Sequence, residues 1–373
     1  MKQVKCPVCN GKVVKFGRTN AGAQRWICKE CRTTFTNKIN NDSKELQIFL
    51  DWLFGKKTQS EMPGGGRTFR RNTSKYWAIW PMPPKIEDSK DVLYLDGIYL
   101  GRKVCVLICC DDKYVLGWYL CRYEHADAWM ALMRRIAAPR MVVSDGGTGF
   151  RKALKKSWPG TKHQRCVFHV FSQVKRYTTS KPNTLAGFEL YHLAKDLLHV
   201  RSRKEADVWV DRFMKWIQKY QKFLSEVTRD ERGKERPTHE SLLKAEHSLL
   251  RLVRENTLFT YLDEELMTEF NAPATNNRIE GGINARLREM LRNHRGLSIE
   301  RRIKAVYWWC YQHSPEPLSS SELLKVMPTD KSIADIYQKM NEKSRLEKSL
   351  SIWGDAIVWN ELHKSDKSFD NWD

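Results

Sequence analysis

Apolar and polar positions alternate with two different periods along this chain. Residues 43–54 and 67–80 place apolar side chains every three or four positions, which predicts two amphipathic helices. Between them, the capping-box pair Thr58 and Glu61 predicts a short additional helix, which ends at the run of glycines 64–66. Three helices in this order are typical of a helix-turn-helix region.

The last of these helices has a basic face. Its predicted apolar side chains lie on one side, and the opposite side carries four cationic residues: Arg67, Arg70, Arg71 and Lys75. A basic helix of this kind fits the major groove of DNA. An ordinary amphipathic helix with a solvated basic face is the alternative interpretation.

A second pattern begins after the proline-rich linker 81–90. Continuous β-rich runs predict strands, and two helical patterns interrupt them. The predicted order is strand 92–100, strand 103–111, strand 115–124, helix 126–136, strand 141–145, helix 147–157 and strand 163–170. Three successive strands followed by helix, strand, helix and strand predict an α/β RNase H-like core.

Helical spacing returns after this core. The apolar stripe from Trp209 to Val227 and the segments 242–253 and 258–270 predict helices that pack against one another. They form a mostly helical insertion within the α/β unit. Beyond residue 314, two short helical patterns predict a C-terminal tail, to which we assign no function.

Composition indicates a nucleic-acid partner. The chain of 373 residues is 41% hydrophobic, which is enough for real cores, and its longest clean apolar run, Val104–Cys110, is too short to cross a membrane. The formal charge is +21, and residues 1–80 hold 16 Lys and Arg against 5 Asp and Glu, a net +11. A second basic cluster runs from Arg278 to Lys304. We expect a polyanionic partner. No apolar leader opens the chain, so we expect a cytoplasmic protein with reduced thiols.

Four cysteines near the start have the spacing of a metal site. Cys6 and Cys9, then Cys28 and Cys31, follow the pattern C-x2-C-x18-C-x2-C. Two such knuckles supply the four thiolates of a closed structural zinc site, so the segment is predicted to be a zinc ribbon holding one Zn²⁺. Free or redox-active cysteines are the alternative.

Two aspartates stand out in the predicted core. Asp96 lies within an apolar strand, and Asp145 ends another strand before two glycines. A carboxylate in such surroundings is costly unless it is paired or binds a cation, and Mg²⁺ or Mn²⁺ is the natural counter-charge. Asp111 and Asp112 are better explained as turn residues. Glu280, in the first turns of a predicted helix, is our candidate for a third acid.

These segments together resemble a known family. The motifs VLYLDGIYL, VVSDGGTGFRKAL, QRCVFH and TNNRIEGGINARLR resemble, in the same order, DDE transposases of bacterial insertion sequences in the Mutator-like group. The resemblance implies catalysis by Asp96, Asp145 and Glu280, which would hold two Mg²⁺ or Mn²⁺ ions. It also implies a role in site architecture for Cys166 and His169. The N-terminal zinc ribbon is a departure from many relatives.

The resemblance implies metal-dependent cleavage and strand transfer of double-stranded DNA, at terminal inverted repeats and at a target, by a homodimer or larger assembly associated with the nucleoid. Arg278, Arg286 and Arg288 would hold the DNA backbone near Glu280. Two alternatives remain open: a non-catalytic DNA-binding regulator derived from a transposase, and an RNase H-like nuclease or resolvase. The expected parts are the zinc ribbon 1–38, the helix-turn-helix-like region 41–81, the first part of the core 90–178, the all-helical insertion 179–272, the final core helix 273–313 and the C-terminal helical tail 314–373.

Overall fold

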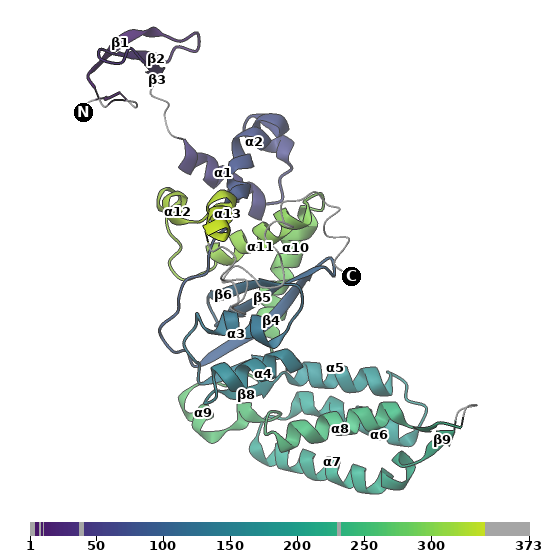
Figure 1. The fold of residues 1–373 in the computed structure, drawn as a ribbon. Helices are drawn as coiled ribbons and strands as arrows, with labels where there is room; N and C mark the ends of the chain where they lie inside the picture. Colours follow the sequence, from purple (N-terminus) through teal and green to yellow (C-terminus); the bar gives the residue numbers. More distant parts are fainter. Residues whose placement is uncertain (1–3, 7–8, 10, 37–40, 230–232, 340–373) are drawn as a thin grey trace.

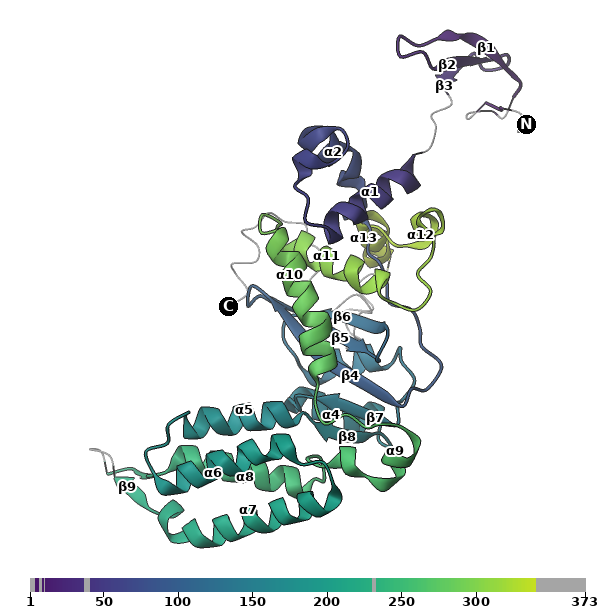
Figure 2. The same ribbon diagram turned by 180° about the vertical axis from the view of Figure 1, so that it is seen from behind.

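A computed structural model describes residues 4–6, 9, 11–36, 41–229 and 233–339, with side chains up to residue 335. Figures 1 and 2 show an elongated molecule in which a small N-terminal sheet, a group of helices, a larger sheet and a bundle of long helices follow one another. The larger sheet, which contains Asp96, lies between the two helical parts.

The N-terminal sheet has three short antiparallel strands, β1 (Val13–Arg18), β2 (Gln24–Cys28) and β3 (Thr34–Thr36), with β2 in the middle. Most of its side chains are partly or fully exposed, but Cys6 and Cys28 are buried. A unit this small has little apolar core, so a bound metal would be its natural source of stability.

The helices that follow are α1 (Asp42–Phe54) and α2 (Gly65–Thr73), with a 3₁₀ turn at Gln59–Glu61 between them. Thr58 and Glu61 form the predicted capping box. The prediction of one helix over 67–80 is wrong at its end, because α2 gives way to a 3₁₀ turn at Ser74–Ala78. This turn brings Tyr76 and Trp77 onto α1, where the Tyr76 hydroxyl donates to the Asp42 carbonyl oxygen at 2.6 Å.

The larger sheet has five strands in the order β6-β5-β4-β7-β8. Their bounds are β4 (Val92–Leu100), β5 (Val104–Cys110), β6 (Val115–Cys121), β7 (Met141–Ser144) and β8 (Lys162–Arg165). The first three are antiparallel neighbours, whereas β7 runs parallel to both β4 and β8. The predicted succession of strands and helices up to β7 is confirmed.

Helices cover both faces of this sheet. Side chains of α3 (Ala126–Met133) and α4 (Thr148–Ser157) pack with Leu93 and Leu95 on one face. On the other face, α11 (Ile299–Gln312) packs with a core that includes Tyr94 and Ile98. Alternate residues of β4 therefore face different layers, as the pleat of a strand requires.

The predicted fifth strand, 163–170, is only half correct. Strand β8 ends at Arg165, and α5 begins at Val167 and continues to Thr178. Buried residues of α5 recur at Val167, Val170 and Val174, which is a helical period hidden by β-branched side chains. The predicted helix 258–270 is likewise divided into a 3₁₀ turn at Thr260–Leu262 and the short α9 (Glu264–Glu269).

Four helices form the bundle beyond the sheet (Figures 1 and 2). They are α5, α6 (Leu185–Asp196), α7 (Arg203–Leu224) and α8 (Glu240–Arg254); a 3₁₀ turn, Leu197–His199, follows α6. Trp209 and Trp216 of α7 are buried, and their ring nitrogens donate to the carbonyl oxygens of Leu193 and Ala186. A small hairpin of β9 (Val227–Arg229) and β10 (Glu235–Pro237) joins α7 to α8.

The chain then returns to the larger sheet. A π-helix, Arg278–Asn284, leads into α10 (Ala285–Asn293), and α11 follows. Two further helices, α12 (Ser320–Val326) and α13 (Asp330–Lys339), pack near α1 and α11, as Figure 1 shows. They lie in the predicted C-terminal tail 314–373, of which the structure describes residues up to 339.

A fully buried cation joins α11 to α13. The Lys304 side chain is 0% exposed, and its Nζ lies 2.6 and 2.8 Å from the two carboxylate oxygens of Asp330 and 3.0 Å from Glu300. Its ammonium group also lies 4.8 Å from the centre of the Trp80 ring. This network ties the end of the described chain to the segment that enters β4.

We expect Asp330→Ala to destabilise the protein, because it leaves the buried Lys304 charge without its bidentate partner. Removing one member of a buried pair typically costs about 3 kcal/mol or more. Urea unfolding followed by tryptophan fluorescence measures the change. The exposed Asp335 on the same helix provides the control, and Asp335→Ala should stay within about 0.5 kcal/mol of the native chain. Equal unfolding midpoints for the two variants would contradict the expectation.

Candidate active site

The parallel pairing of β4 and β7 places the two predicted aspartates side by side. Val92 pairs with Met141, and Tyr94 pairs with Val143. The same register continued for two residues sets Asp96 opposite Asp145, and neighbouring strands are about 4.8 Å apart. Both residues also follow the alternation of Tyr94 and Val143, so they face the same side of the sheet. Strand β7 ends just before Asp145, so the sheet is open beyond this end of β7, next to β4.

The loop after Asp145 is shaped by its glycines. Gly146 has φ +73°, and a Cβ atom there would lie 2.7 Å from the Arg165 side chain. Only glycine therefore fits this position. The backbone nitrogen of Gly147 donates to Asp145 Oδ1 at 3.1 Å. Behind the loop, the Ser144 hydroxyl accepts from the Gly146 nitrogen and lies 2.9 Å from His163 Nε2.

Glu280 reaches the same place from the π-helix. Two asparagines hold this helix against β4: the Asn284 amide donates to Asp96 Oδ2 at 2.7 Å, and the Asn276 amide donates to the Leu95 carbonyl oxygen at 3.4 Å. Both asparagine side chains are fully buried. Asn277 precedes this helix without capping it through its side chain, whereas Asn276 anchors the helix to the strand.

Electrostatics show that the three acids are close. Burial raises the pKa of Asp96 to about 7, and the negative charges of Glu280 and Asp145 add to this effect. The pKa of Glu280 is also raised by burial and by Asp145, whereas Arg288 and a hydrogen bond with Asn276 lower it. The structure thus brings together the three acids that the sequence singled out. Burial and mutual repulsion make their ionised forms less stable.

Cys166 and His169 lie beside Glu280. The three ligand atoms that these side chains offer are within 4.8 Å of one another. Cys166 directly precedes α5, and its sulfur accepts a hydrogen bond from the Asn276 backbone nitrogen at 3.2 Å. Burial lowers the pKa of His169, which favours the neutral imidazole. The pair therefore packs the π-helix against α5 and also offers Glu280 a possible co-ligand.

The donor set fits a hard divalent cation. Among the described residues, Glu280 Oε1, Asn276 Oδ1 and Asn284 Oδ1 are buried oxygens without a hydrogen-bond partner. His169 Nδ1 lies 3.2 Å from Glu280 Oε1, yet neither atom makes a hydrogen bond. Buried oxygens without donors, grouped with carboxylates, are a suitable environment for Mg²⁺ or Mn²⁺.

Sequence reasoning missed several residues of this site. Glu124, which follows β6, has a pKa raised to about 7 by burial and by Asp145 and Asp96. Arg165, Asn276 and Asn284 also contact the loop or the acids. The asparagines stood in the motif around Glu280, but their buried contacts with β4 depend on a chain separation of more than 180 residues. Nothing in the local pattern distinguished Glu124 from a polar residue that ends a strand.

The four N-terminal cysteines form a second cluster. Their sulfur atoms lie within 4.8 Å of one another, with Cys6 to Cys31 at 3.5 Å and Cys9 to Cys28 at 3.4 Å. A tetrahedral zinc with ligands at 2.3 Å separates its sulfurs by about 3.8 Å. The cluster can therefore hold a structural zinc ion.

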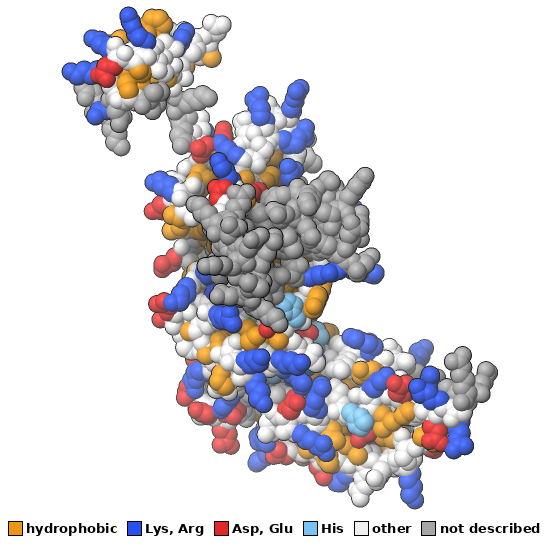
Figure 3. All heavy atoms as spheres, in the orientation of Figure 1, with side chains coloured by type: hydrophobic (Ala, Val, Ile, Leu, Met, Phe, Trp, Pro, Cys, Tyr) orange, Lys and Arg blue, Asp and Glu red, His pale blue; other side chains and the backbone are white. Residues whose placement is uncertain are grey.

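The predicted basic face of α2 is exposed. Arg67, Arg70 and Arg71 project to solvent, and Figure 3 shows Lys and Arg side chains over α2 and over the N-terminal sheet. Lys75 differs, because its ammonium group contacts Asp42 and lies 2.8 Å from Glu45 on α1. Its charge is partly neutralised within the protein, so it is less suited to a phosphate contact than the three arginines are.

The three predicted arginines near Glu280 are all exposed. Arg278 donates to the Asp112 carbonyl oxygen, and Arg288 is close enough to lower the pKa of Glu280. Arg286 lies on α10. Burial lowers the pKa of His313, and the positive charge of Arg286 lowers it further. Of the three, Arg288 is the one whose charge acts on Glu280, and among the described residues none of them forms an ion pair with the acids.

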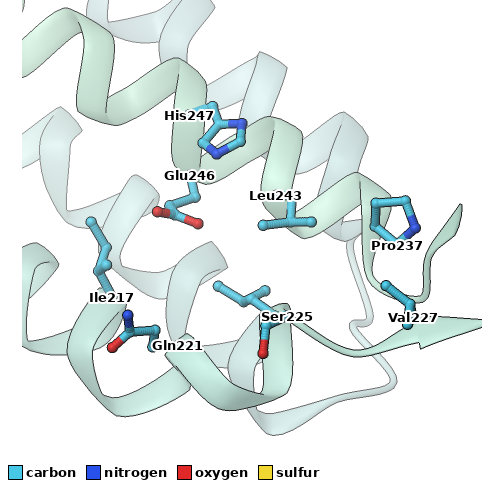
Figure 4. Close-up of a pocket in the computed structure, with 9 residues that line it drawn as sticks. Ile217, Gln221, Ser225, Val227, Pro237, Leu243, Glu246 and His247 are labelled. Carbon is cyan, nitrogen blue, oxygen red and sulfur yellow. The ribbon is translucent and has the colours of Figure 1, made fainter.

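The bundle contains a separate pocket of roughly 300 Å³, between α7, α8 and the hairpin. Figure 4 shows the Glu246 side chain between the two helices, with Ile217 and Leu243 beside it. None of the predicted site residues lines this pocket. It is therefore distinct from the acidic site.

Comparisons with known proteins identify the central segment. Residues 101–232 match the family model "Transposase, Mutator family". The transposase for insertion sequence element IS6120 of Mycolicibacterium smegmatis is 31% identical over 122 residues, which are 28% of this chain and 38% of that protein. The transposase for insertion sequence element IS905 of Lactococcus lactis subsp. lactis (strain IL1403) is 29% identical over 132 residues, 30% of this chain and 33% of the relative.

The predicted resemblance to Mutator-group transposases is thus confirmed for this segment. The chain matches little more than a third of the length of these relatives. The matched family segment contains Asp145, Cys166 and His169, whereas Asp96 and Glu280 lie outside it. In the described part of the chain, no helix has the length and apolar character that a membrane crossing requires.

The raised pKa of Asp96 predicts how stability depends on pH. The folded protein keeps this proton up to about pH 7, but the unfolded chain releases it near pH 4. Between these values the folded state binds more protons, so stability should fall as pH rises, by up to about 1.4 kcal/mol per pH unit for each such group. Thermal unfolding in EDTA between pH 4.5 and 7.5 measures this slope.

Asp96→Asn should make the slope shallower, because it removes the titrating group. Asp88→Asn, at an exposed position in the linker before β4, is the matched control and should leave the slope as it is. The same slope in both variants would contradict the raised pKa of Asp96.

Proposed function

We propose that this chain, whose residues 101–232 match the Mutator family of transposases, is a DDE transposase. It binds the terminal inverted repeats of an insertion sequence and catalyses metal-dependent DNA cleavage and strand transfer. The observation that carries the proposal is the register of β4 and β7, which sets Asp96 beside Asp145. Glu280 approaches them from the π-helix.

We infer an RNase H-like fold for the catalytic core. The strand order β6-β5-β4-β7-β8, with three antiparallel strands first and two parallel strands after them, supports this fold. Helices α6 to α8 then constitute an insertion between the second and third acids, and the π-helix with α10 returns the chain to the core. We also propose that the chain is organised into the six parts expected from the sequence.

The residues of the site have separate tasks in this mechanism. Asp96, Asp145 and Glu280 would hold two Mg²⁺ or Mn²⁺ ions, which would supply Lewis acidity for activating water or a 3′-hydroxyl group and for stabilising the leaving oxygen. Asn284 orients the Asp96 carboxylate, and the Gly147 backbone nitrogen orients Asp145. Arg278, Arg286 and Arg288 bind the DNA backbone, and Cys166 with His169 fixes the position of Glu280.

Recognition of the element's ends is assigned to the N-terminal sheet and to α2. The N-terminal sheet, with one structural Zn²⁺, and the exposed arginines of α2 bind duplex DNA through its phosphates. Joining two DNA ends requires at least two active sites, so the working form is a homodimer or a larger assembly on the nucleoid.

Two other functions make different predictions. A DNA-binding regulator would bind the same ends without cutting them, and a nuclease or resolvase would cut without joining. The regulator does not explain the grouped acids, because a protein that only binds DNA has no use for like charges that raise the pKa of Asp96 and Glu280. A nuclease would use the same acids, so the products of the reaction distinguish it from a transposase.

We expect Asp96→Asn, Asp145→Asn and Glu280→Gln each to lower Mg²⁺- or Mn²⁺-dependent cleavage by roughly 100-fold or more, because each removes a negatively charged oxygen from the metal site. The assay uses a duplex containing the DNA that flanks this gene, and it scores both nicked and joined products. Gel-shift affinity for the same duplex should change little.

Glu264→Gln, at an exposed position on α9, provides the matched control. Full activity of the Asp145→Asn protein would refute the site. Binding by the native chain with no cleavage in either metal would favour the regulator, and cleavage without joined products would favour the nuclease.

We expect about one zinc ion per chain, held by the N-terminal cysteines. The double substitution Cys6→Ser and Cys9→Ser should remove it, because serine hydroxyls are poor zinc ligands and half of the thiolates are lost. Elemental analysis of the purified protein measures the content. Replacement of the buried Cys109 and Cys110 by Ala is the control, since these residues lie in β5. Zinc that survives the double substitution would exclude the N-terminal site.

A further inference from the structure

Glu124 is an acidic residue near the proposed site to which we have not yet assigned a role. It follows β6 and directly precedes His125, the residue that caps α3. A Cβ atom on Gly97 would lie 2.6 Å from Glu124 Oε1, so the carboxylate stands where a side chain of residue 97 would otherwise be. Gly97 is the strand neighbour of Asp96. The missing side chain therefore lets Glu124 approach the proposed site from the opposite face of β4.

The backbone around Glu124 is also fixed relative to Asp145. A Cβ atom on Gly149, in the first turn of α4, would lie 2.7 Å from the Glu124 carbonyl oxygen and 3.0 Å from His125 Cα. Helix α4 begins three residues after Asp145. The segment that carries Glu124 is thus packed closely against the helix that follows the second aspartate.

Glu124 is held without a cationic partner among the described residues. No ion pair between it and a Lys or Arg is found among the described residues, and the Tyr99 side chain supplies a hydrogen bond. Burial raises its pKa, and so do the charges of Asp145 and Asp96. An acid held in this way is costly in the absence of a cation.

A second observation, independent of Glu124, indicates a cation beside Asp96. Asn284 is 0% exposed, and its amide nitrogen is bound to Asp96 Oδ2 at 2.7 Å. Its amide oxygen nevertheless has no hydrogen-bond partner among the described residues. A buried amide oxygen beside carboxylates is a ligand that Mg²⁺ and Mn²⁺ accept.

We propose that Glu124 is a fourth carboxylate of the divalent-cation site, reaching the open edge of the sheet through the space above Gly97. The proposal rests on the proposed function, because it takes Asp96 and Asp145 as members of that site. It adds a residue from the β6–α3 connection, on the face of the sheet opposite Asp96. Carboxylates from both faces then meet beyond the end of β7.

Binding of Mn²⁺ alone tests this proposal without any DNA. The zinc-loaded full chain is titrated at pH 8, where the carboxylates are ionised, and the free Mn²⁺ is measured by electron paramagnetic resonance. We expect Glu124→Gln to weaken Mn²⁺ binding by about 10-fold or more. The exposed Glu264→Gln variant should bind like the native chain.

Thermal unfolding gives a second readout, which a purely structural role would not produce. Without metal, Glu124→Gln should melt at a higher temperature than the native chain, because it removes a repelling charge. With saturating Mn²⁺, its gain in melting temperature should be smaller than that of the native chain. Should Glu124→Gln fail to fold, Glu124→Asp retains the charge at a shorter reach and should still weaken binding.

The outcomes separate the two proposals. Native Mn²⁺ affinity in Glu124→Gln, with weakened affinity in Asp96→Asn and Asp145→Asn, would overturn the role of Glu124 alone. Native affinity in all three variants would remove the cation site itself, and with it the proposed function.

Discussion

The repulsion between carboxylates held at one open edge of the sheet is the constraint around which this protein is organised. Burial and neighbouring negative charge raise the pKa of both Asp96 and Glu124 to about 7. The surrounding structure sustains this arrangement with neutral donors: the Asn284 amide and the Gly147 backbone nitrogen. Neutral donors hold the carboxylates in place without cancelling the charge that a cation requires.

The same constraint explains the local irregularities. Strand β7 is short, which opens space beyond Ser144, and glycines stand at positions 97 and 146, where a side chain would collide with Glu124 or Arg165. The helix that carries Glu280 begins as a π-helix, a form that is rare and is frequent at functional sites. Each of these irregularities lies next to an acid, whereas the core strands β5 and β6 are uniformly buried.

Much of this arrangement was predictable from the sequence, because strand and helix periods, the cysteine spacing and the three acids all lie in local patterns. The failures have physical causes. In α5, valines hid a helical period, and after Thr73 aromatic packing against α1 replaced the α-helix with a 3₁₀ turn. Glu124 was missed because its significance depends on Gly97, a residue on another strand. Contacts between segments that are far apart in the sequence produce no periodic pattern from which they could be predicted.

The charge of the chain and the charge of its site are opposed, and the proposed function requires both. A formal charge of +21 attracts DNA, yet grouped carboxylates repel the phosphodiester that must reach them. Arg278, Arg286 and Arg288 are exposed on the segment that carries Glu280, and Arg288 already lowers the pKa of Glu280. Fixed cations can bring the backbone to the rim of the site. Under the proposed function, divalent cations among the carboxylates would reduce the repulsion at its centre, so we expect metal binding to precede or accompany the approach of DNA.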